Sequence, residues 1–316
     1  MIRIERYSQE RKKDWDLFVD NAKNGIFMHK RDYMDYHSNR FTDNSLIFYR
    51  DDNILSLLPL SLHGKELISH GGLTYGGFIM SKEMKQNVMN DCFLSLIDYM
   101  KDNGFSKLEY KKIPYIFSNI PSDEDLYSLY LYGAEIFKIE PSSVLNLESQ
   151  IKMSKGRKAQ ISRGKKYVTV QRSYDFDTFI ELENKVLSER HSTKAVHSAD
   201  ELKSLQISFE DEIQLWVAMY EGIMIAASLL FVYDNVVHTQ YMAADDTARK
   251  IGGLDAIIDF LIKKFSNEKK YFDFGISSEN FGHELNYGLI AQKESFGART
   301  MNYQTWILDI NKSIEK

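Results

Sequence analysis

The feature that most constrains the fold is an order of predicted elements that occurs twice. Apolar periodicity and turn residues predict a strand, two helices, three strands, a helix, a strand, a helix and a strand, first within residues 1–145 and again within residues 146–316. Each half has the size of an ordinary domain. The repeat therefore favours a tandem duplication, with two mixed α/β (α+β) domains, over one large domain.

The predicted strands of the first half cover Met1–Arg6, Ser45–Tyr49, Ile54–Ser61, Leu67–Leu73, Lys107–Lys111 and Glu135–Ile139. Its predicted helices cover Arg11–Ala22, Lys30–Asn39, Met84–Asp102 and Ser122–Tyr132, the last with Ser122 as its cap. The predicted strands of the second half cover Tyr167–Gln171, Ile213–Tyr220, Met224–Tyr233, Val236–Ala243, Tyr271–Phe274 and Arg299–Ile310. Its predicted helices cover Phe176–Arg190, Ala199–Gln206, Lys250–Phe265 and Glu284–Phe296. The halves are predicted to join within Pro141–Arg163.

Composition excludes several classes of protein. The net charge of −5 argues against a general nucleic-acid binder, although a local basic run is present. The single cysteine, Cys92, excludes an internal disulfide framework and a cysteine-based zinc site. The histidines are scattered, so we expect no metal site. No signal-peptide h-region and no long apolar run is present, and we expect a cytoplasmic protein without a transmembrane segment.

The antiparallel strand meander that leads into a long helix and then a strand resembles the order of the acetyltransferase (GNAT) fold. In that fold the third meander strand and the next strand splay apart. The following helix then points its N-terminus at the pyrophosphate of acyl-CoA. A helix start suits a phosphate because it offers unpaired N–H groups and a favourable dipole.

Three stretches of sequence narrow the resemblance. They are the glycine-rich segment Ser69–Gly77, the Phe-Asp-Phe-Gly-Ile segment Phe272–Ile276, and the Gln-Lys-Glu-Ser-Phe-Gly-Ala segment Gln292–Ala298. Together they resemble the FemAB/FemX-like acyltransferases and their relatives in bacterial polysaccharide gene clusters. Members of that family carry two GNAT-like domains, which agrees with the duplication read from the element order. No heptad insert that would form a coiled-coil arm is present.

The resemblance implies acyl transfer, with acyl-CoA as donor and the amine of an amino sugar or cell-envelope precursor as acceptor. An alternative is aminoacyl transfer from aminoacyl-tRNA to a peptidoglycan precursor. A third reading is a non-catalytic tandem GNAT protein that binds a carbohydrate or a protein. The site would lie in the second domain or in a groove between the domains.

The stretch that replaces the pyrophosphate loop of acetyl-CoA enzymes departs from the usual pattern. It runs from Asp246 to Leu254 and keeps two cations and two glycines. We assign the donor's pyrophosphate to these four residues: Arg249, Lys250, Gly252 and Gly253. The imperfect loop is also the feature that favours the non-catalytic reading.

Four residues are candidates for catalysis. Tyr241 and His238 lie on one predicted strand, and we expect Tyr241 to protonate the leaving group and His238 to act as a base. Asp273 is placed near the end of a strand, where the sites of α/β proteins gather. Lys293 matches the lysine of the family segment, whose counterpart meets the phosphate or carbonyl region of the substrate. Structural roles, such as a locally bonded tyrosine or a lysine at a helix end, stay open for each of them.

Three further groups are candidates for substrate binding. In the glycine-rich segment they are Ser69, His70 and Tyr75. Arg157 and Lys158 belong to a run of cations without an acid between Glu148 and Asp175, which suits a phosphate of a nucleotide-linked sugar, of CoA or of a tRNA acceptor end. A polar loop adds Glu279, Asn280 and Asn286. The alternative readings are a plain β-turn, a solvated linker and a capped helix.

Overall fold

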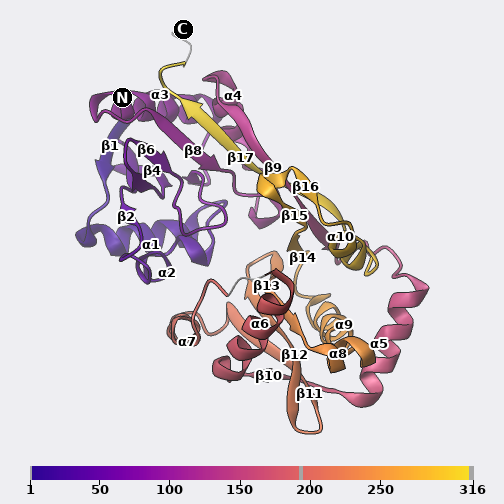
Figure 1. Cartoon of the computed structure of the whole chain (residues 1–316). Coiled ribbons are helices and arrows are strands. Elements are labelled where there is room, and N and C mark those ends of the chain that lie inside the picture. The colour runs from indigo at the N-terminus through magenta and orange to yellow at the C-terminus, as the bar shows by residue number, and fades with distance from the viewer. Residues whose placement is uncertain (1, 192–194, 313–316) are drawn as a thin grey trace. The chain divides into compact units, whose positions relative to one another are not determined.

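The computed structural model describes residues 2–191 and 195–312. The chain divides into two compact units (Figure 1). Unit 1 comprises the described residues of Met1–Glu140 and Asn302–Lys316, and unit 2 comprises those of Pro141–Met301. Within the described residues no helix combines the length and the hydropathy needed to span a bilayer.

Unit 1 contains two groups of paired strands. The antiparallel group has the order β1 (Ile2–Arg6), β3 (Leu46–Arg50), β4 (Asn53–Leu58) and β7 (Ile79–Met80). In the second group β17 (Arg299–Asp309) pairs antiparallel with β8 (Lys107–Lys111), and β8 pairs parallel with β6. The group continues through short strands: β6 (Glu66–Ile68), β5 (Ser61–His63) and β2 (Thr42–Asp43).

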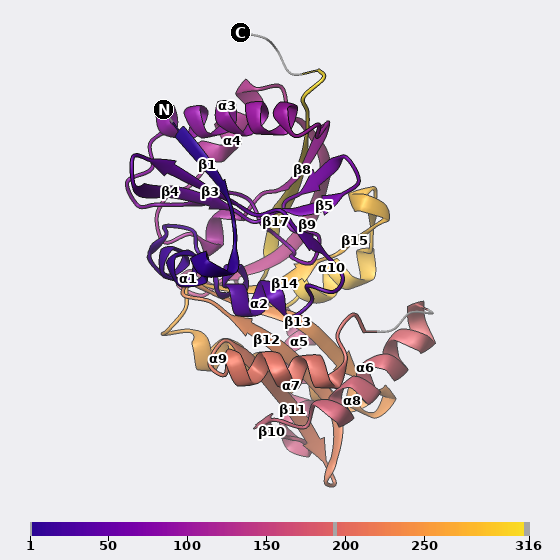
Figure 2. The same cartoon turned by 90° about the vertical axis from the view of Figure 1, so that its left-hand side faces the viewer.

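Helices cover the strands of unit 1. They are α1 (Lys12–Asn21), α2 (Arg31–Asp35), α3 (Gln86–Asp102) and α4 (Glu124–Leu131). Figure 2 shows α3 with α4 on one side of the strands and α1 with α2 on the other. The apolar face of α3 packs into the core, and Cys92 is a fully buried member of it. Burial of this stripe, at about 25 cal/mol per Å² of apolar surface, stabilises the unit.

The main sheet of unit 2 has helices on both faces, and a small two-stranded sheet pairs β15 (Ser278–Glu279) with β16 (Glu284–Leu285). The strand order is β10 (Thr169–Ser173), β11 (Ile213–Tyr220), β12 (Ile223–Val232), β13 (Val236–Ala244), β14 (Tyr271–Ile276) and the second half of β9 (Glu135–Asn146). In Figure 1, α6 (Phe176–His191) and α7 (Ala199–Ser208) lie on one side of the sheet. The other side carries α5 (Lys155–Tyr167), α8 (Asp246–Ile251) and α9 (Gly253–Phe265).

Strands β13 and β14 separate along their length. Their parallel pairing covers only Val236–His238 and Tyr271–Asp273, whereas β13 continues to Ala244. On the other edge of β13, Leu229 of β12 faces Tyr241 and the next residue faces Thr239, so Gln240 forms a β-bulge. The backbone of β13 beyond its first three residues is therefore free of β14. This is the splay that the GNAT resemblance implies, and the mixed, mostly antiparallel fold is confirmed.

Several boundaries in the structure differ from the predicted ones. Residues 302–312 belong to unit 1 and not to a second domain of residues 146–316, because β17 pairs with β8. The predicted join contains the first nine of the thirteen residues of helix α5 (Lys155–Tyr167). The helix expected over Lys250–Phe265 is two helices, since Gly252 adopts a left-handed φ of 86° between them. Ser122 bonds to the carbonyl of Ile120 instead of capping α4.

Candidate functional site

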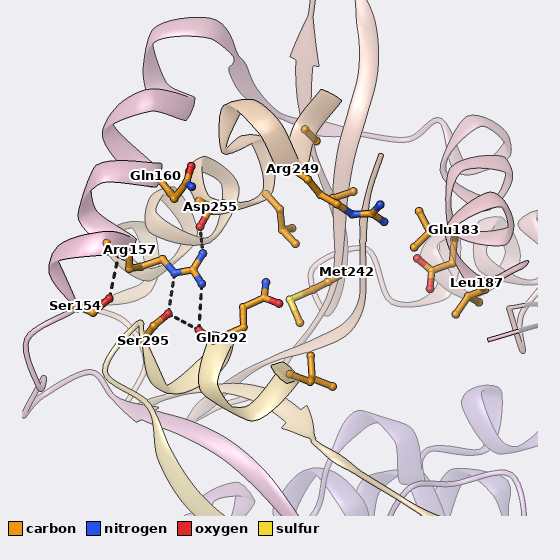
Figure 3. Close-up of a pocket in the computed structure, with 16 residues that line it drawn as sticks. Ser154, Arg157, Gln160, Glu183, Leu187, Met242, Arg249, Asp255, Gln292 and Ser295 are labelled. Atoms are coloured by element: carbon orange, nitrogen blue, oxygen red, sulfur yellow. Dashed lines mark hydrogen bonds and ion pairs between the residues drawn. The ribbon is translucent and has the colours of Figure 1, made fainter. Parts of the chain in front are cut away.

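A cavity of about 640 Å³ opens within unit 2. Figure 3 shows its walls, which come from the first turns of α5, from α6, from the end of β13, from α8 and α9, and from α10 (Tyr287–Glu294). The walls lie where β13 has parted from β14. The polar side chains that matter most for its chemistry are Arg157, Glu183, Arg249, Asp255 and Gln292.

Arg157 forms one fixed wall of the cavity. Its guanidinium is ion-paired with Asp255 of α9, and its Nε donates to Ser295 Oγ at 2.8 Å. The guanidinium carbon lies 4.4 Å from the centre of the Phe296 ring. Burial lowers the pKa of Arg157, but the carboxylate partner offsets the cost of the charge. Arg157 therefore ties α5 to α9 and to the end of α10, and its charge is largely neutralised within the protein.

Helix α5 begins at a clear cap that the sequence prediction missed. Ser154 Oγ accepts from the backbone N–H of Arg157 at 3.1 Å, and Ser154 N–H donates to Ser295 O at 2.9 Å. Farther along α5, Gly164 lies against Gly252, and a Cβ on Gly164 would be 2.1 Å from Gly252 O. Gly252 thus serves the close packing of α5 on the junction of α8 and α9.

The predicted pyrophosphate residues are only partly brought together. Arg249 lies on the cavity wall, ion-paired with Asp246 at 2.9 Å. Lys250 is exposed, and its carbonyl oxygen accepts from Arg163. Gly253 packs on α8, where its Cβ would lie 3.1 Å from that of Ala248.

The start of α8 already holds an anion. Asp245 Oδ1 accepts from the backbone N–H of Ala248 at 2.7 Å, and Asp246 occupies the first turn. These two carboxylates occupy and neutralise the helix start that a phosphate would use in the GNAT arrangement.

Lys293 is buried beside the end of β14. Only 3% of it is exposed, and its Nζ donates to the carbonyl oxygens of Gly275 at 2.9 Å and Ile276 at 2.6 Å. It borders a small apolar recess that shares Met242 and Gln292 with the cavity. Burial lowers the pKa of Lys293 to about 8. The lysine therefore fixes the turn after β14 and places a cation at the edge of the cavity.

Asp273 and His238 form a buried pair away from the cavity walls. Asp273 is fully buried and accepts from Ser142 Oγ at 2.5 Å, from Gly275 N–H at 2.9 Å and from His238 Nδ1 at 2.9 Å. These bonds join β14 to β9 and β13. The pair stabilises the point at which the strands separate, and neither side chain lines the cavity.

Tyr241 follows the bulge on β13. Its hydroxyl is hydrogen-bonded to His197 Nδ1 at 2.7 Å, and its ring lies 6.2 Å from that of Phe179. Burial raises the pKa of Tyr241 to about 12, so the phenol keeps its proton at neutral pH. The sequence prediction did not foresee the histidine partner.

The sequence prediction also missed Glu183. It is 5% exposed, lines the cavity, and its Oε2 has no hydrogen-bond partner within the described parts of the chain. Burial raises the pKa of Glu183 to about 7. A signal for it exists in the sequence, because Phe176, Phe179 and Ile180 define an apolar helical stripe that continues at position 183. An acid in that stripe is the anomaly.

The fold of the chain as a whole is similar to that of several solved structures. FemX covers 98% of this chain and is itself covered over 98% of its length, with a TM-score of 0.69 at 12% identity. The chain has a FemX-like GNAT fold. L-PGS from Bacillus licheniformis matches with a TM-score of 0.64 at 14% identity, over 98% of this chain and 94% of that one. A tandem GNAT protein from the clavulanic acid biosynthesis pathway matches with a TM-score of 0.55 at 9% identity, over 98% and 99%.

No protein-family model and no curated protein sequence matches the chain. The FemX-like assignment is therefore one of fold. Within the described residues no group of three or more His, Cys, Asp or Glu side chains is arranged to hold a metal ion.

The candidates of the glycine-rich segment are buried parts of unit 1. Ser69 Oγ accepts from the backbone N–H of Lys111 at 2.7 Å. Tyr75 is 1% exposed and its ring centre lies 4.7 Å from that of Phe117. His70 has a φ of 55°, and burial lowers its pKa to about 2. These contacts belong to the core of unit 1, and the cavity of the FemX-like unit 2 does not include them.

The remaining candidates lie on the surface of unit 2. Asn286 caps α10 by accepting from Leu289 N–H at 3.0 Å, and its Nδ2 donates to Glu279 at 3.1 Å. Asn280 Nδ2 donates to Glu284 at 3.1 Å. These bonds match the capped-helix alternative. Lys158 is exposed on α5, beside the cavity-lining residues of that helix.

Proposed function

We propose that the chain is an acyltransferase that moves an aminoacyl group from aminoacyl-tRNA onto an amine of a cell-envelope precursor. The observation that carries this proposal is a cavity at the β13–β14 splay with an acid-free basic helix, α5, at its edge. The FemX-like fold supports the reaction class, because aminolysis of an ester or thioester needs mainly positioning and oxyanion donors.

The exposed face of α5 suits a nucleic-acid backbone. Lys158 and Lys166 lie three and eleven residues after Lys155, which places the three lysines on one side of the helix. Each is exposed and has no ion-pair partner among the residues that the structure describes. Such cations bind phosphates in a salt-dependent way. They would hold the acceptor end of a tRNA while its ester enters the cavity.

Three groups have roles in the proposed reaction. The amine attacks the ester carbonyl, and backbone N–H groups of β13 beyond Thr239 offer donors to the developing oxyanion. Lys293 adds a positive charge at the edge of the site. Tyr241 precedes the cavity-lining Met242 on β13 and carries a proton at neutral pH, which it would donate to the departing ribose oxygen, with His197 holding the phenol in place.

Acyl-CoA is the second candidate donor. Arg249 favours it, since the guanidinium borders the cavity and would reach a phosphate. The two carboxylates at the start of α8, Asp245 and Asp246, weigh against a pyrophosphate there. We therefore rank the tRNA ester first.

Binding measurements separate the two donors. Titration of the protein with tRNA at several salt concentrations, and with acetyl-CoA, gives both affinities. We expect tRNA to bind and the double variant Lys155→Ala/Lys158→Ala to weaken it, with the slope of log affinity against log salt reduced by about 2. The matched control is Lys82→Ala/Lys85→Ala, an exposed lysine pair with the same spacing in unit 1.

The decisive experiment measures the transfer of a radiolabelled aminoacyl group from tRNA to an amine acceptor. No tRNA binding, together with micromolar binding of acetyl-CoA that Arg249→Ala weakens, would replace the donor by acyl-CoA. Binding of neither donor would contradict the transferase proposal and favour a binding protein.

A further inference from the structure

We propose that Glu183 is the subsite for the substrate's primary amine, which it binds as an ammonium and deprotonates for attack. This inference rests on the proposed acyl transfer for the second step. The first step, ammonium recognition, stands on the cavity alone.

The Glu183 side chain is buried, and one of its oxygens lacks a hydrogen bond among the described residues. Glu183 lines the cavity from α6, is 5% exposed, and its Oε2 accepts no hydrogen bond from the described residues. Burying a carboxylate without a hydrogen-bond partner lowers the stability of the fold by roughly several kcal/mol. Such a group in a native protein therefore indicates a site where a ligand supplies the partner. The ligand that satisfies such an oxygen carries N–H donors and preferably a positive charge.

Arg157, on the opposite wall of the cavity, does not supply the positive charge that would pair with Glu183. Figure 3 shows Arg157 and Glu183 on opposite sides of the cavity, with Met242 between them. The Arg157 guanidinium is ion-paired with Asp255. Among the described residues, the cation on one side of the cavity is therefore paired with an acid, and the acid on the other side has no cationic partner.

In the described parts of the elements that neighbour α6, the following charged groups are paired with other residues. On β13 the titratable groups are Tyr241, whose phenol keeps its proton and bonds to His197, and His238, which is paired with Asp273 at 2.9 Å. Strand β12 has no titratable side chain. On α7, Lys203 is ion-paired with Asp177 at 2.7 Å and lies on the surface. On α8, Arg249 pairs with Asp246.

The proton balance of the step is simple. The amine enters as R–NH₃⁺ and Glu183 as a carboxylate. The proton passes to the carboxylate, which leaves R–NH₂ and a neutral carboxyl group in the cavity. The amine nitrogen then forms a bond to the ester carbonyl carbon, and the bond from that carbon to the ribose oxygen breaks. Tyr241 gives its phenol proton to the leaving oxygen, and the resulting phenolate takes the second proton from the nitrogen, which leaves the neutral amide and restores the phenol. Glu183 finally releases its proton to water. The raised pKa of Glu183, about 7, suits a base at neutral pH.

Ammonium recognition is tested without any turnover. The probe is n-butylammonium chloride, with n-pentanol as the uncharged comparison, and the signal is the ¹³C-methyl NMR resonance of Met242, which borders the same cavity. Above pH 7 the carboxylate predominates, so we expect n-butylammonium to bind about tenfold more tightly at pH 8 than at pH 6. Glu183→Gln should abolish this difference, while Glu181→Gln, an exposed acid on the same helix, should preserve it.

The pH dependence of transfer tests the deprotonation. Glu183→Gln should lower kcat by about 10²- to 10⁴-fold and remove the rise of rate through pH 7, and Glu183→Asp should restore part of the rate. Thermal unfolding confirms that each variant is folded. Butylammonium binding that is equal in wild type and Glu183→Gln, or that does not change with pH, would overturn the amine subsite.

The two proposals fail in distinguishable ways. If no aminoacyl-tRNA or acyl-CoA is turned over while Glu183-dependent ammonium binding persists, the transferase proposal fails and the amine subsite stands. If Glu183→Gln transfers the aminoacyl group at the wild-type rate with an unchanged pH profile, the transferase stands and the role of Glu183 as a base is wrong.

Discussion

Gly164 of α5 and Gly252 at the junction of α8 and α9 are in backbone contact, with no room for a side chain between them. A Cβ on Gly164 would lie 2.1 Å from Gly252 O and 3.1 Å from the Cβ of Ala256. The contact sets the position of α5, and α5 carries both Arg157 and the basic face. The glycine pair therefore determines the geometry of one cavity wall.

Replacing Gly164 with alanine should separate these helices. We expect Gly164→Ala to lower the free energy of unfolding by about 3 kcal/mol, because backbone atoms would have to move. Gly156→Ala on the same helix is the matched control: its Cβ would meet nothing within 4 Å, and the change should raise stability by up to about 1 kcal/mol. Urea unfolding measures both. Equal effects of the two variants would contradict the contact.

Removing Arg157 should leave a buried charge without its partner. Only 14% of the Asp255 side chain is exposed, so Arg157→Ala should destabilise the protein by about 3 kcal/mol. The double variant Arg157→Ala/Asp255→Ala should cost clearly less than the sum of the single variants. Urea unfolding of all four proteins completes the cycle, and strict additivity would show that the ion pair is not coupled.

Glu183 should make stability fall as the pH rises. Its pKa is about 7 in the folded protein against an ordinary 4.5, so the folded state binds the proton more tightly. The stabilising contribution is complete below pH 4.5 and is lost between pH 4.5 and 7, by about 3 kcal/mol. The loss should be absent in Glu183→Gln. Urea unfolding at pH 5 and pH 8 measures it, and parallel pH curves for wild type and variant would refute it.

Lys293 should change the stability of the protein in the alkaline range. Its pKa is about 8 in the folded protein against an ordinary 10.5, so the unfolded state binds the proton more tightly between these values. Stability should therefore rise from pH 8 towards pH 10.5 on account of this residue, by about 3 kcal/mol in total. Lys293→Met should remove that part of the rise. Guanidinium unfolding at pH 8 and pH 10 tests this, and an identical rise in the variant would rule it out.

Local patterns were sufficient to predict the central meander of unit 2. Strands β11, β12 and β13 are apolar runs separated by Glu221-Gly222 and Asp234-Asn235, and short-range turn chemistry determines such hairpins. Helix α5 was missed because it buries little besides Ile161 and Gly164, so it lacks an apolar stripe.

The site was harder to predict than the fold. Asp273 is satisfied by Ser142, which is 131 residues away in the sequence, and no local pattern reveals such a bond. Lys293 and Tyr241 were assigned from motif and strand position, and the structure places Lys293 at the edge of the cavity. Glu183 was missed although it interrupts an apolar stripe, because a lone acid on a helix is usually solvent-exposed.

The late position of β17 in the chain has a consequence during protein synthesis. Strand β8 ends at Lys111, and its partner stretch in β17 is Thr305–Asp309, so the ribosome makes the strands of unit 2 between the two. Until β17 emerges, the nascent unit 1 carries an open edge on β8 and lacks the core residues Trp306 and Leu308. Unit 1 therefore cannot complete its sheet and its core until the strands of unit 2 have been made.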